Sequence, residues 1–308
     1  MRVAVVDLGT NSTRLLVADV QDGGELTELA RRSTVTRLGD GVDAGGRLDD
    51  DAMERVFDVL ADYRRLIDAG GAERVVAVAT SAVRDAENGE WFREALHERF
   101  EIDAQIIPGE EEARLTFLGA TADREERDAE LMVMDIGGGS TEFVIGHPGS
   151  DPRFHVSTTL GSVRHTERHI EQDPPAHQEL EALRRDARRI IEEDVPAEVR
   201  QSVDAGIAVA GTATQLASID LEAKGGGGNT HGHRLGLDTC RELLERLASV
   251  PLEERREIPG LDPDRAPTIV AGTAILVEGI EAFGLDSIEV SVADILHGAA
   301  LDAWAQTA

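Results

Sequence analysis

Two short segments of the chain have the residue types that bind phosphate and a divalent cation. Residues 5–17 read VVDLGTNSTRLLV and residues 133–145 read VMDIGGGSTEFVI, a match without gaps. Each copy ends an apolar stretch with an aspartate and follows it with a glycine-containing turn. Such a carboxylate can bind a hard cation, and the backbone N–H groups of the turn can bind phosphate oxygens. Two such turns at matched positions predict a phosphate site that arose by duplication.

The candidate ligands are the turn residues and the acidic residues of the two copies. The expected phosphate-binding residues are Gly9, Thr10, Asn11, Ser12, Gly137, Gly138, Gly139 and Ser140. The consecutive glycines of the second copy would let the backbone approach a ligand closely. Asp7, Asp135 and Glu142 are the candidate metal ligands, with Mg²⁺ or Mn²⁺ as the expected ion. On spacing alone, Glu142 could equally be an exposed strand carboxylate.

Apolar periodicity predicts that the same series of elements surrounds each turn. In the first half we expect a hairpin, a strand near 34–38, a helix over 50–69, a strand over 74–79, a helix near 90–98, a strand near 104–107 and a helix over 110–122. In the second half we expect a hairpin over 131–146, a strand over 153–159, helices to 193, a strand over 206–210, further helices, a strand over 287–290 and a helix from about 294. The sequence therefore predicts two mixed α/β domains, 1–125 and 126–308, with a cleft between them; the final helix, about 294–308, could pack back on the first domain.

The charge balance limits the possible partners. Thirty-one basic and 60 acidic residues give a net charge of −29, which repels nucleic acid and anionic membranes. No apolar run is long enough to span a bilayer, and the first residues do not resemble a signal peptide. We therefore expect a cytoplasmic protein. Cys240 is the only cysteine, which excludes an intrachain disulfide and a cysteine-cluster metal site.

Four motifs in order carry a family resemblance. They are DLGTNS at 7–12, TSAVRDAEN at 80–88, GEEEARL at 109–115 and DIGGGSTE at 135–142. The chain resembles, over nearly its whole length, the exopolyphosphatase/guanosine pentaphosphate phosphohydrolase (Ppx/GppA) family of the actin-like ATPase superfamily. The resemblance implies two duplicated actin-like, ribonuclease H-like domains with an interdomain cleft, and a homodimer is compatible with it.

The same resemblance assigns roles to individual residues. It implies that Glu112 is the general base, with Glu111 as the second choice, and that Arg84 binds phosphate and offsets developing charge. Acidic residues at a helix start are common, so their chemistry alone would not single out a base. Asn88 would shape the loop of Arg84. Residues 211–214 (GTAT) lie where related proteins bind a nucleoside, although they could equally form a helix start packed on the sheet.

Departures from the family pattern refine the expectation. Residues 292–298 (VADILHG) replace an arginine-containing segment of many members, and the chain has none of the helical and HD-like domains that longer members append. We therefore expect short polyphosphate chains as substrate rather than very long ones. Four further basic residues could line the path of the anion: Arg164, Arg168, His231 and Arg234.

Three functions fit these residues. The first is a metal-dependent exopolyphosphatase, which releases the terminal phosphate of inorganic polyphosphate as orthophosphate. The second is a guanosine pentaphosphate (pppGpp) 5′-phosphohydrolase, which would use the same residues. The third is a sensor that binds a nucleotide or alarmone without turnover. A sensor would not need a water-activating carboxylate, so the presence of Glu112 favours an enzyme.

Overall fold

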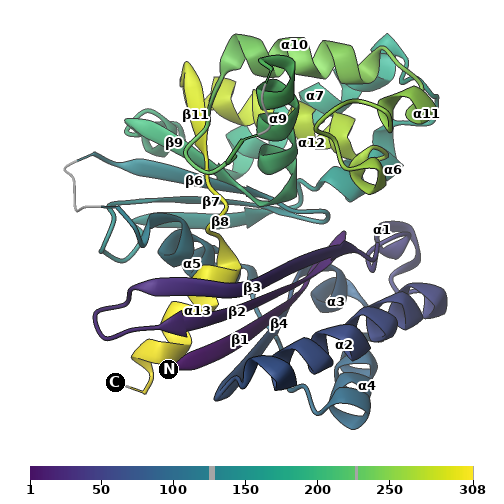
Figure 1. Cartoon of the computed structure of the whole chain (residues 1–308). Coiled ribbons are helices and arrows are strands. Elements are labelled where there is room, and N and C mark those ends of the chain that lie inside the picture. The colour runs from purple at the N-terminus through teal and green to yellow at the C-terminus, as the bar shows by residue number, and fades with distance from the viewer. Residues whose placement is uncertain (125–128, 226–227, 308) are drawn as a thin grey trace. The chain divides into compact units, whose positions relative to one another are not determined.

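The chain folds into two units. The computed structural model describes residues 1–124, 129–225 and 228–307. Unit 1 comprises Met1–Ala122 together with Asp294–Ala308, and unit 2 comprises Asp123–Ala293. Unit 1 is therefore discontinuous in sequence, because the last helix of the chain joins the elements that come first (Figure 1).

Unit 1 is built on a five-stranded sheet in the order β3-β2-β1-β4-β5. The strands are β1 (Arg2–Leu8), β2 (Ser12–Val20), β3 (Leu26–Val35), β4 (Arg74–Ala79) and β5 (Ala104–Ile106). β2 is antiparallel to both β1 and β3, whereas β4 is parallel to β1 and β5 is parallel to β4. The segment from Val3 to Leu8 is buried throughout, as expected for a central strand covered on both faces.

Helices cover both faces of this sheet. Ala4, Val6 and Leu8 pack in a core with α2 (Asp50–Gly70) and α4 (Gly89–Phe100). Val3 and Val5 pack on the other face with α5 (Gly109–Thr121) and α13 (Ile295–Ala305). Because successive side chains of a strand alternate between faces, Asp7 belongs to the α5/α13 face. Short helices α1 (Val42–Gly45) and α3 (Ser81–Asp85) complete the unit.

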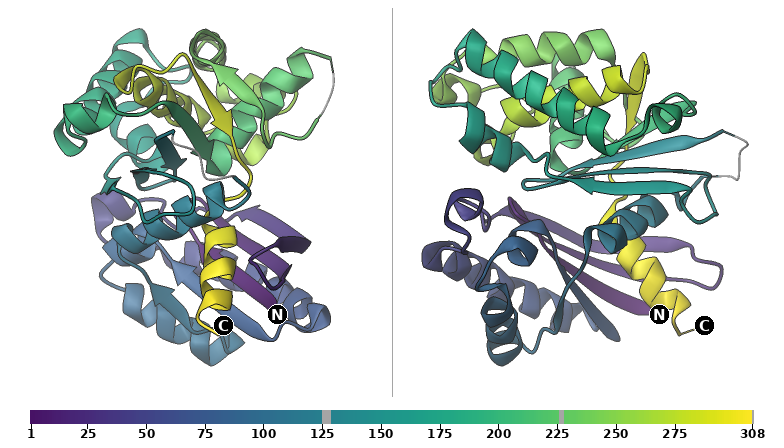
Figure 2. Two further views of the ribbon diagram at one scale, coloured as in Figure 1. Left: turned by 90° about the vertical axis from the view of Figure 1, so that its left-hand side faces the viewer. Right: turned by 180° about the vertical axis from the view of Figure 1, so that it is seen from behind.

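Two glycines allow α5 and α13 to pack closely. A Cβ atom added at Gly119 would lie 2.0 Å from the carbonyl oxygen of Asp294, and one at Gly298 would lie 1.8 Å from that of Leu115. Side chains at these positions would force the helices apart. Both views in Figure 2 show α13, in yellow, beside the purple strands of the same unit.

Unit 2 repeats the sheet topology of unit 1. Its strands are β6 (Leu131–Ile136), β7 (Thr141–Gly146), β8 (Phe154–Thr158), β9 (Ala205–Val209), β10 (Arg234–Gly236) and β11 (Ser287–Val290). The order β8-β7-β6-β9-β11 corresponds to β3-β2-β1-β4-β5, and β10 adds one antiparallel strand beside β11. The duplication predicted from the two sequence copies is thus present in the folded chain.

The central helix of unit 2 is α12 (Ile269–Ala282), which is buried almost along its whole length. The others are α6 (Ser162–His169), α7 (His177–Asp194), α8 (Ala197–Arg200), α9 (Ala210–Ala223), α10 (Leu237–Ala248) and α11 (Leu252–Arg255). Glu278 of α12 is a buried carboxylate, and its two oxygens accept hydrogen bonds from Arg184 and Arg188 of α7. Pairing both oxygens offsets the cost of burying this charge.

Several elements differ from the sequence prediction. The third strand of unit 1 runs over Leu26–Val35, so the prediction of a strand near 34–38 placed it too late. Most of its residues are exposed at the sheet edge, and a strand of this kind lacks the apolar alternation that marks a buried one. The short helices α1, α3 and α8 and the three-residue strand β10 were not predicted, because elements of this length contain too few residues for a periodic pattern.

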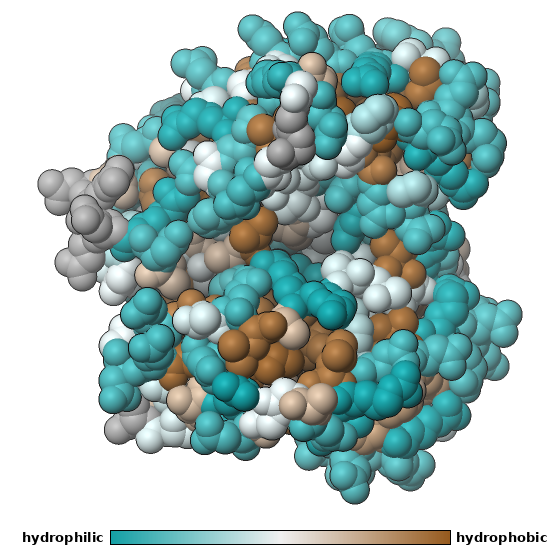
Figure 3. Space-filling model, in the orientation of Figure 1, coloured by the Kyte–Doolittle hydropathy of each residue, from teal (hydrophilic) through white to brown (hydrophobic). Residues whose placement is uncertain are grey.

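The surface agrees with the composition. Hydrophilic residues cover most of the face drawn in Figure 3. Over the described ranges of the chain, every helix is either too short or too polar to cross a membrane.

Candidate active site

The first turn, residues 9–11, joins β1 to β2 and is fixed by backbone hydrogen bonds. The amide of Gly9 donates to the carbonyl oxygen of Ser12 over 3.1 Å. The turn carbonyls accept from the segment after β3: Thr10 from Gly39 at 2.8 Å, and Asn11 from Thr36 and Arg37 at 3.0 Å each. The carbonyl oxygens of Thr10 and Asn11 are thus satisfied within unit 1.

The second turn, residues 137–139, joins β6 to β7 in the same way. The amide of Gly137 donates to the carbonyl oxygen of Ser140 over 2.9 Å, the equivalent of the Gly9 bond. The turn carbonyls accept from the start of α6. Gly137 accepts from the Ser162 amide at 3.0 Å, and Gly138 accepts from the Val163 amide at 2.9 Å. The side chain of Arg164 donates from Nε to the carbonyl oxygen of Gly139 over 2.9 Å.

Both turns therefore present amides rather than carbonyls. Within the described residues, the amides of Thr10 and Asn11 in the first turn donate to no protein acceptor. The same holds for Gly138 and Gly139 in the second turn, again counting only the residues that the structure describes. Carbonyl oxygens would repel a phosphate, whereas N–H groups bind it. Each turn is suited to bind an anion.

Gly161 explains how α6 can lie so close to the second turn. A Cβ atom at this position would lie 2.2 Å from the carbonyl oxygen of Gly138 and 2.5 Å from the carbonyl carbon of Gly139. The backbone of Gly161 is extended, with φ −148°, so any residue could adopt its conformation. The requirement for glycine here is one of space alone.

Asp7 forms a buried ion network with two residues that the sequence analysis did not select. Its Oδ2 atom accepts a hydrogen bond from Nε of Arg14 over 2.7 Å, and Arg14 also pairs with Asp294. Asp294 caps α13 by accepting from the Leu296 amide at 3.0 Å. Burial raises the pKa of Asp7, and Arg14 opposes that rise. Burial would also raise the pKa of Asp294, but Arg14 and Arg31 hold it below its usual value.

The corresponding pair in unit 2 has the opposite charge pattern. Asp135 and Glu142 are direct cross-strand partners, as are Asp7 and Arg14 in unit 1. A position that carries a cation in the first copy thus carries a carboxylate in the second. Asp135 and Glu142 are both buried, and Glu142 accepts a hydrogen bond from Ser157 Oγ over 2.7 Å. Direct cross-strand partners lie on the same face of a sheet, so this pair offers oxygen ligands to one ion. The alternative of an exposed carboxylate at Glu142 is wrong.

Glu112 and Arg84 meet in unit 1. Nη1 of Arg84 donates to Oε2 of Glu112 over 2.9 Å and to the carbonyl oxygen of Ile107 over 3.0 Å. Glu112 lies in the first turn of α5 and is buried, whereas about a quarter (24%) of the Arg84 side chain is exposed. In the part of the chain that the structure describes, Nε and Nη2 of Arg84 donate no hydrogen bond. Those two donors can therefore serve a phosphate.

Glu111, the alternative base, is held elsewhere. Arg114 donates from Nε and Nη2 to the two carboxylate oxygens of Glu111, over 2.9 and 2.7 Å, and also pairs with Asp302. These hydrogen bonds lower the pKa of Glu111, which weakens it as a base. Glu112 instead contacts Arg84, the residue expected to bind phosphate, and its role as the base stays a prediction.

Comparison with known proteins assigns the fold and the family. The model of the Ppx/GppA phosphatase family matches residues 16–306. The chain belongs to this family. An Exopolyphosphatase 2 of Mycobacterium tuberculosis is 37% identical over 317 residues, which cover 97% of this chain and 98% of that protein.

Solved structures of Ppx/GppA proteins share the two-unit α/β fold. The crystal structure of the Aquifex aeolicus family member matches with a TM-score of 0.82 and 31% identity, covering 100% of this chain and 98% of that one. An exopolyphosphatase from Cytophaga hutchinsonii matches with a TM-score of 0.90 and 25% identity, covering 98% of each chain. The chain thus has the actin-like, duplicated fold of this Ppx/GppA group.

Two further positions implied by the Ppx/GppA resemblance have clear structural contacts. Asn88, the residue before α4, accepts from the Leu48 amide at 2.8 Å and donates to the Leu48 carbonyl oxygen at 3.0 Å, which fixes the start of α4 to the loop before α2. At Gly211, a Cβ atom would lie 1.8 Å from Nη1 of Arg265. The guanidinium of Arg265 therefore fills the space next to this glycine at the start of α9.

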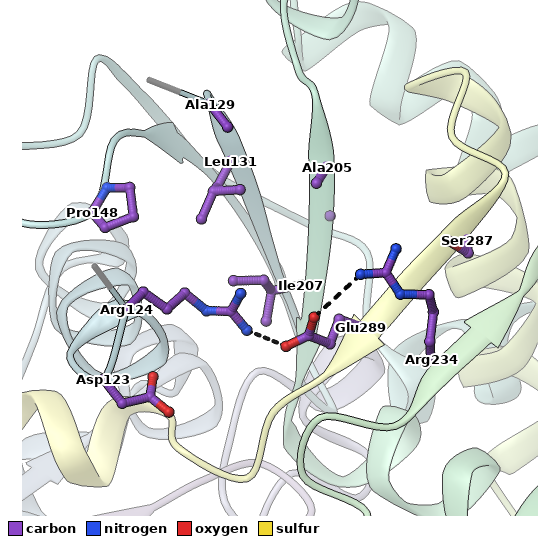
Figure 4. Close-up of a pocket in the computed structure, with 11 residues that line it drawn as sticks. Asp123, Arg124, Ala129, Leu131, Pro148, Ala205, Ile207, Arg234, Ser287 and Glu289 are labelled. Carbon is purple, nitrogen blue, oxygen red and sulfur yellow. Dashed lines mark hydrogen bonds and ion pairs between the residues drawn. The ribbon is translucent and has the colours of Figure 1, made fainter. Parts of the chain in front are cut away.

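Of the basic residues suggested to line the anion's path, Arg164 contacts the second turn and Arg234 does not. Arg234 lines a pocket of about 390 Å³ with Leu131 and Glu289 (Figure 4). Leu131 is the first residue of β6, whereas the second turn follows the last residue of β6. The pocket and the turn are therefore separated by the length of the strand, about 16 Å. Arg234 and Arg124 both pair there with Glu289. His231 lies near this end as well, 3.3 Å from Asp123, which also lines the pocket.

Proposed function

We propose that this chain is an exopolyphosphatase that hydrolyses the terminal phosphoanhydride bond of short inorganic polyphosphate and releases orthophosphate. Membership of the Ppx/GppA family makes it a phosphoanhydride hydrolase. The observation that carries the proposed mechanism is the contact between Glu112 and Arg84. It combines a buried carboxylate with a guanidinium that retains donors for phosphate oxygens.

In the proposed reaction, Glu112 accepts a proton from a water molecule as the water attacks the terminal phosphorus. Arg84 orients the Glu112 carboxylate through Nη1, and its Nε and Nη2 donors offset charge on the phosphoryl oxygens in the transition state. The amides of each turn can bind phosphate oxygens. Binding a condensed phosphate through fixed backbone N–H groups requires little reorganisation during the reaction.

The residues present fit a hard divalent cation. Asp135 and Glu142 supply carboxylate oxygens from neighbouring strands, the ligand type that Mg²⁺ prefers. Asp7 faces the cationic Arg14 across its hairpin, whereas Asp135 faces a second carboxylate, so we propose Asp135 and Glu142 as the principal ligands among the three acidic candidates. A bound Mg²⁺ or Mn²⁺ would neutralise negative charge on the phosphates.

Phosphate release from polyphosphates of defined length and from pppGpp, with Mg²⁺ or with EDTA, tests the proposal. We expect a higher kcat/KM on short polyphosphate than on pppGpp and loss of turnover in EDTA. The Glu112→Gln protein, purified in parallel, controls for a contaminating phosphatase. A higher kcat/KM on pppGpp would assign the nucleotide reaction instead. Tight binding without release of phosphate from either substrate would indicate a sensor.

The ligand assignment has its own test. Asp135→Asn should raise the Mg²⁺ concentration needed for half-maximal turnover by about tenfold or more, because one charged ligand is lost. Asp151→Asn, an exposed aspartate in the same unit, is the matched control. An unchanged Mg²⁺ requirement in Asp135→Asn would remove Asp135 from the metal site.

A further inference from the structure

Three side chains behind the second turn form a cluster that phosphate hydrolysis does not use. His165 and His169 lie four residues apart on α6, and Asp186 lies on α7. Residues at this spacing project from the same face of a helix. One ligand atom from each of the three lies within 4.8 Å of those from the other two. Helix α7 is therefore positioned to add a carboxylate to the histidine pair.

His165 lacks the hydrogen bond that its burial requires. Its side chain is fully buried, and among the described residues its Nε2 atom has no hydrogen-bond partner. A buried ring nitrogen without a partner costs free energy and calls for an explanation, such as a role as a ligand. Burial lowers the pKa of His165 to about 4, so the ring is neutral, which is the form that coordinates metals.

The distances are those of a small coordination shell. Oδ2 of Asp186 lies 3.1 Å from Nε2 of His169 and 3.6 Å from Nε2 of His165. In a tetrahedral site with bonds of about 2.0–2.2 Å, neighbouring ligand atoms lie roughly 3.4 Å apart. The other oxygen of Asp186, Oδ1, accepts a hydrogen bond from Arg189 at 2.7 Å. Such an outer contact fixes the orientation of a ligating carboxylate.

We propose that His165, His169 and Asp186 bind one divalent transition-metal ion of the Zn²⁺ type. Two imidazoles and one carboxylate suit Zn²⁺, Co²⁺ or Ni²⁺ rather than Mg²⁺, which prefers oxygen ligands. Three protein ligands leave the fourth tetrahedral position to water. This ion is distinct from the cation proposed at Asp135 and Glu142.

Binding would change one hydrogen bond next to the second turn. The Gly161 amide donates to Nδ1 of His165 over 3.3 Å, which places the ring proton on Nε2. Coordination through Nε2 needs that proton on Nδ1, so the ion must displace the Gly161 hydrogen bond. At 3.3 Å this bond is longer than usual and is correspondingly easy to lose. The proposal thus links ion binding to Gly161, the residue that packs on Gly138.

The experiment uses the full chain, stripped of metal with EDTA and dialysed into buffer with saturating Mg²⁺. Co²⁺ is added and followed by its visible absorption, which is strong only for a tetrahedral ion, and Zn²⁺ is then used to displace it. We expect one Co²⁺ per chain and a lower Kd for Zn²⁺ than for Co²⁺. A parallel titration with Asp135→Asn should give the same spectrum, which excludes the Mg²⁺ ligands as the source.

His169→Gln and Asp186→Asn should each weaken Zn²⁺ binding by about tenfold or more, and Zn²⁺ should raise the Tm of the wild-type chain but not of these variants. His177→Gln, an exposed histidine on α7, is the matched control. Circular dichroism confirms that the variants fold. Absence of a tetrahedral Co²⁺ spectrum in the wild-type chain, or equal Zn²⁺ affinity in folded His169→Gln and Asp186→Asn proteins, would overturn the proposal and leave the cluster as a contact between α6 and α7.

Discussion

Arg84 donates a 2.9 Å hydrogen bond to Glu112, although 28 residues separate the two in the chain. Arg84 comes from α3, which follows β4, and Glu112 comes from the first turn of α5, which follows β5. β4 and β5 are parallel neighbours, so their carboxyl ends meet at one edge of the sheet. The sheet thus brings a carboxylate and a guanidinium together there, where ligand sites of α/β folds commonly lie.

Replacing Glu112 with Gln should abolish most turnover. The amide keeps the size of the side chain but cannot accept a proton from water, so we expect kcat to fall by about 10²-fold or more. Binding of a short polyphosphate, measured by calorimetry, should change little. Glu111→Gln is the control, because Arg114 already holds that carboxylate. Near wild-type kcat in Glu112→Gln would exclude Glu112 as the base.

Arg84→Lys should separate charge from geometry. Lysine keeps the positive charge but lacks the planar guanidinium that contacts Glu112, the Ile107 carbonyl and, as proposed, a phosphate. We expect kcat to fall by roughly 10²-fold, the scale for losing one donor to developing charge. Arg93→Lys, which affects an exposed pair with Glu90, should leave kcat unchanged. If both variants retained full activity, the transition-state role of Arg84 would be wrong.

Gly161→Ala should disturb the second turn without backbone strain. The new methyl group would lie 2.2 Å from the Gly138 carbonyl oxygen, so α6 and the turn must move apart. We expect the free energy of unfolding to fall by roughly 1–3 kcal/mol and KM for polyphosphate to rise. Gly45→Ala, at a position with no neighbouring atom within 4 Å, should have no such effect. Chemical denaturation and steady-state kinetics measure the two quantities.

His165 should make the metal-free protein less stable as the pH falls. The ring takes up a proton near pH 6.5 when unfolded, but only near pH 4 when folded. Between these values the unfolded state binds more protons, so the free energy of unfolding decreases with decreasing pH. From pH 7 to 5.5 the expected loss from this residue is about 1 kcal/mol.

Denaturation of the wild-type chain and of His165→Gln, both in EDTA at pH 7 and 5.5, checks this prediction. Aggregation would interfere near the pI of about 4.6, and both pH values lie above it. The variant should lose about 1 kcal/mol less than the wild type over the interval. Equal losses in the two proteins would mean that His165 accepts a proton as readily in the folded state as in the unfolded one.

Much of the fold follows from the sequence because the repeat is strong. The matched copies place β1 and β2 opposite β6 and β7, and the apolar runs of β4 and β9 mark the next strand in each unit. Prediction of strands from the sequence failed where the residues of the strand are little buried. Most residues of the edge strand β3 are exposed, so the strand lacks the apolar alternation that would mark where it begins.

The candidate site was only partly accessible from sequence. The turns could be located, but the choice between Glu111 and Glu112 could not be made from the residues alone, because it depends on Arg114 and Arg84. Arg14 was overlooked although the alignment of the copies contains its signal. Arg14 occupies in the first copy the position that Glu142 occupies in the second. Asp7 therefore faces a positive charge, whereas Asp135 faces a negative one.

The histidine pair at 165 and 169 was also visible in the sequence as an i, i+4 spacing. Its acidic partner was not, because Asp186 comes from another helix and is one of 60 acidic residues. Asp186 can be identified as the partner of the two histidines only from the packing of α6 against α7.

The discontinuity of unit 1 has a consequence for biosynthesis. Val3 and Val5 are synthesised before unit 2, but α13, which packs on them and supplies Asp294 to Arg14, is synthesised after the whole of unit 2. This face of β1 therefore lacks the α13 part of its native cover until unit 2 has been synthesised, although α5 is already present. Unit 2 can complete its fold on the nascent chain before unit 1 does, which reverses the usual order in which the amino-terminal part folds first.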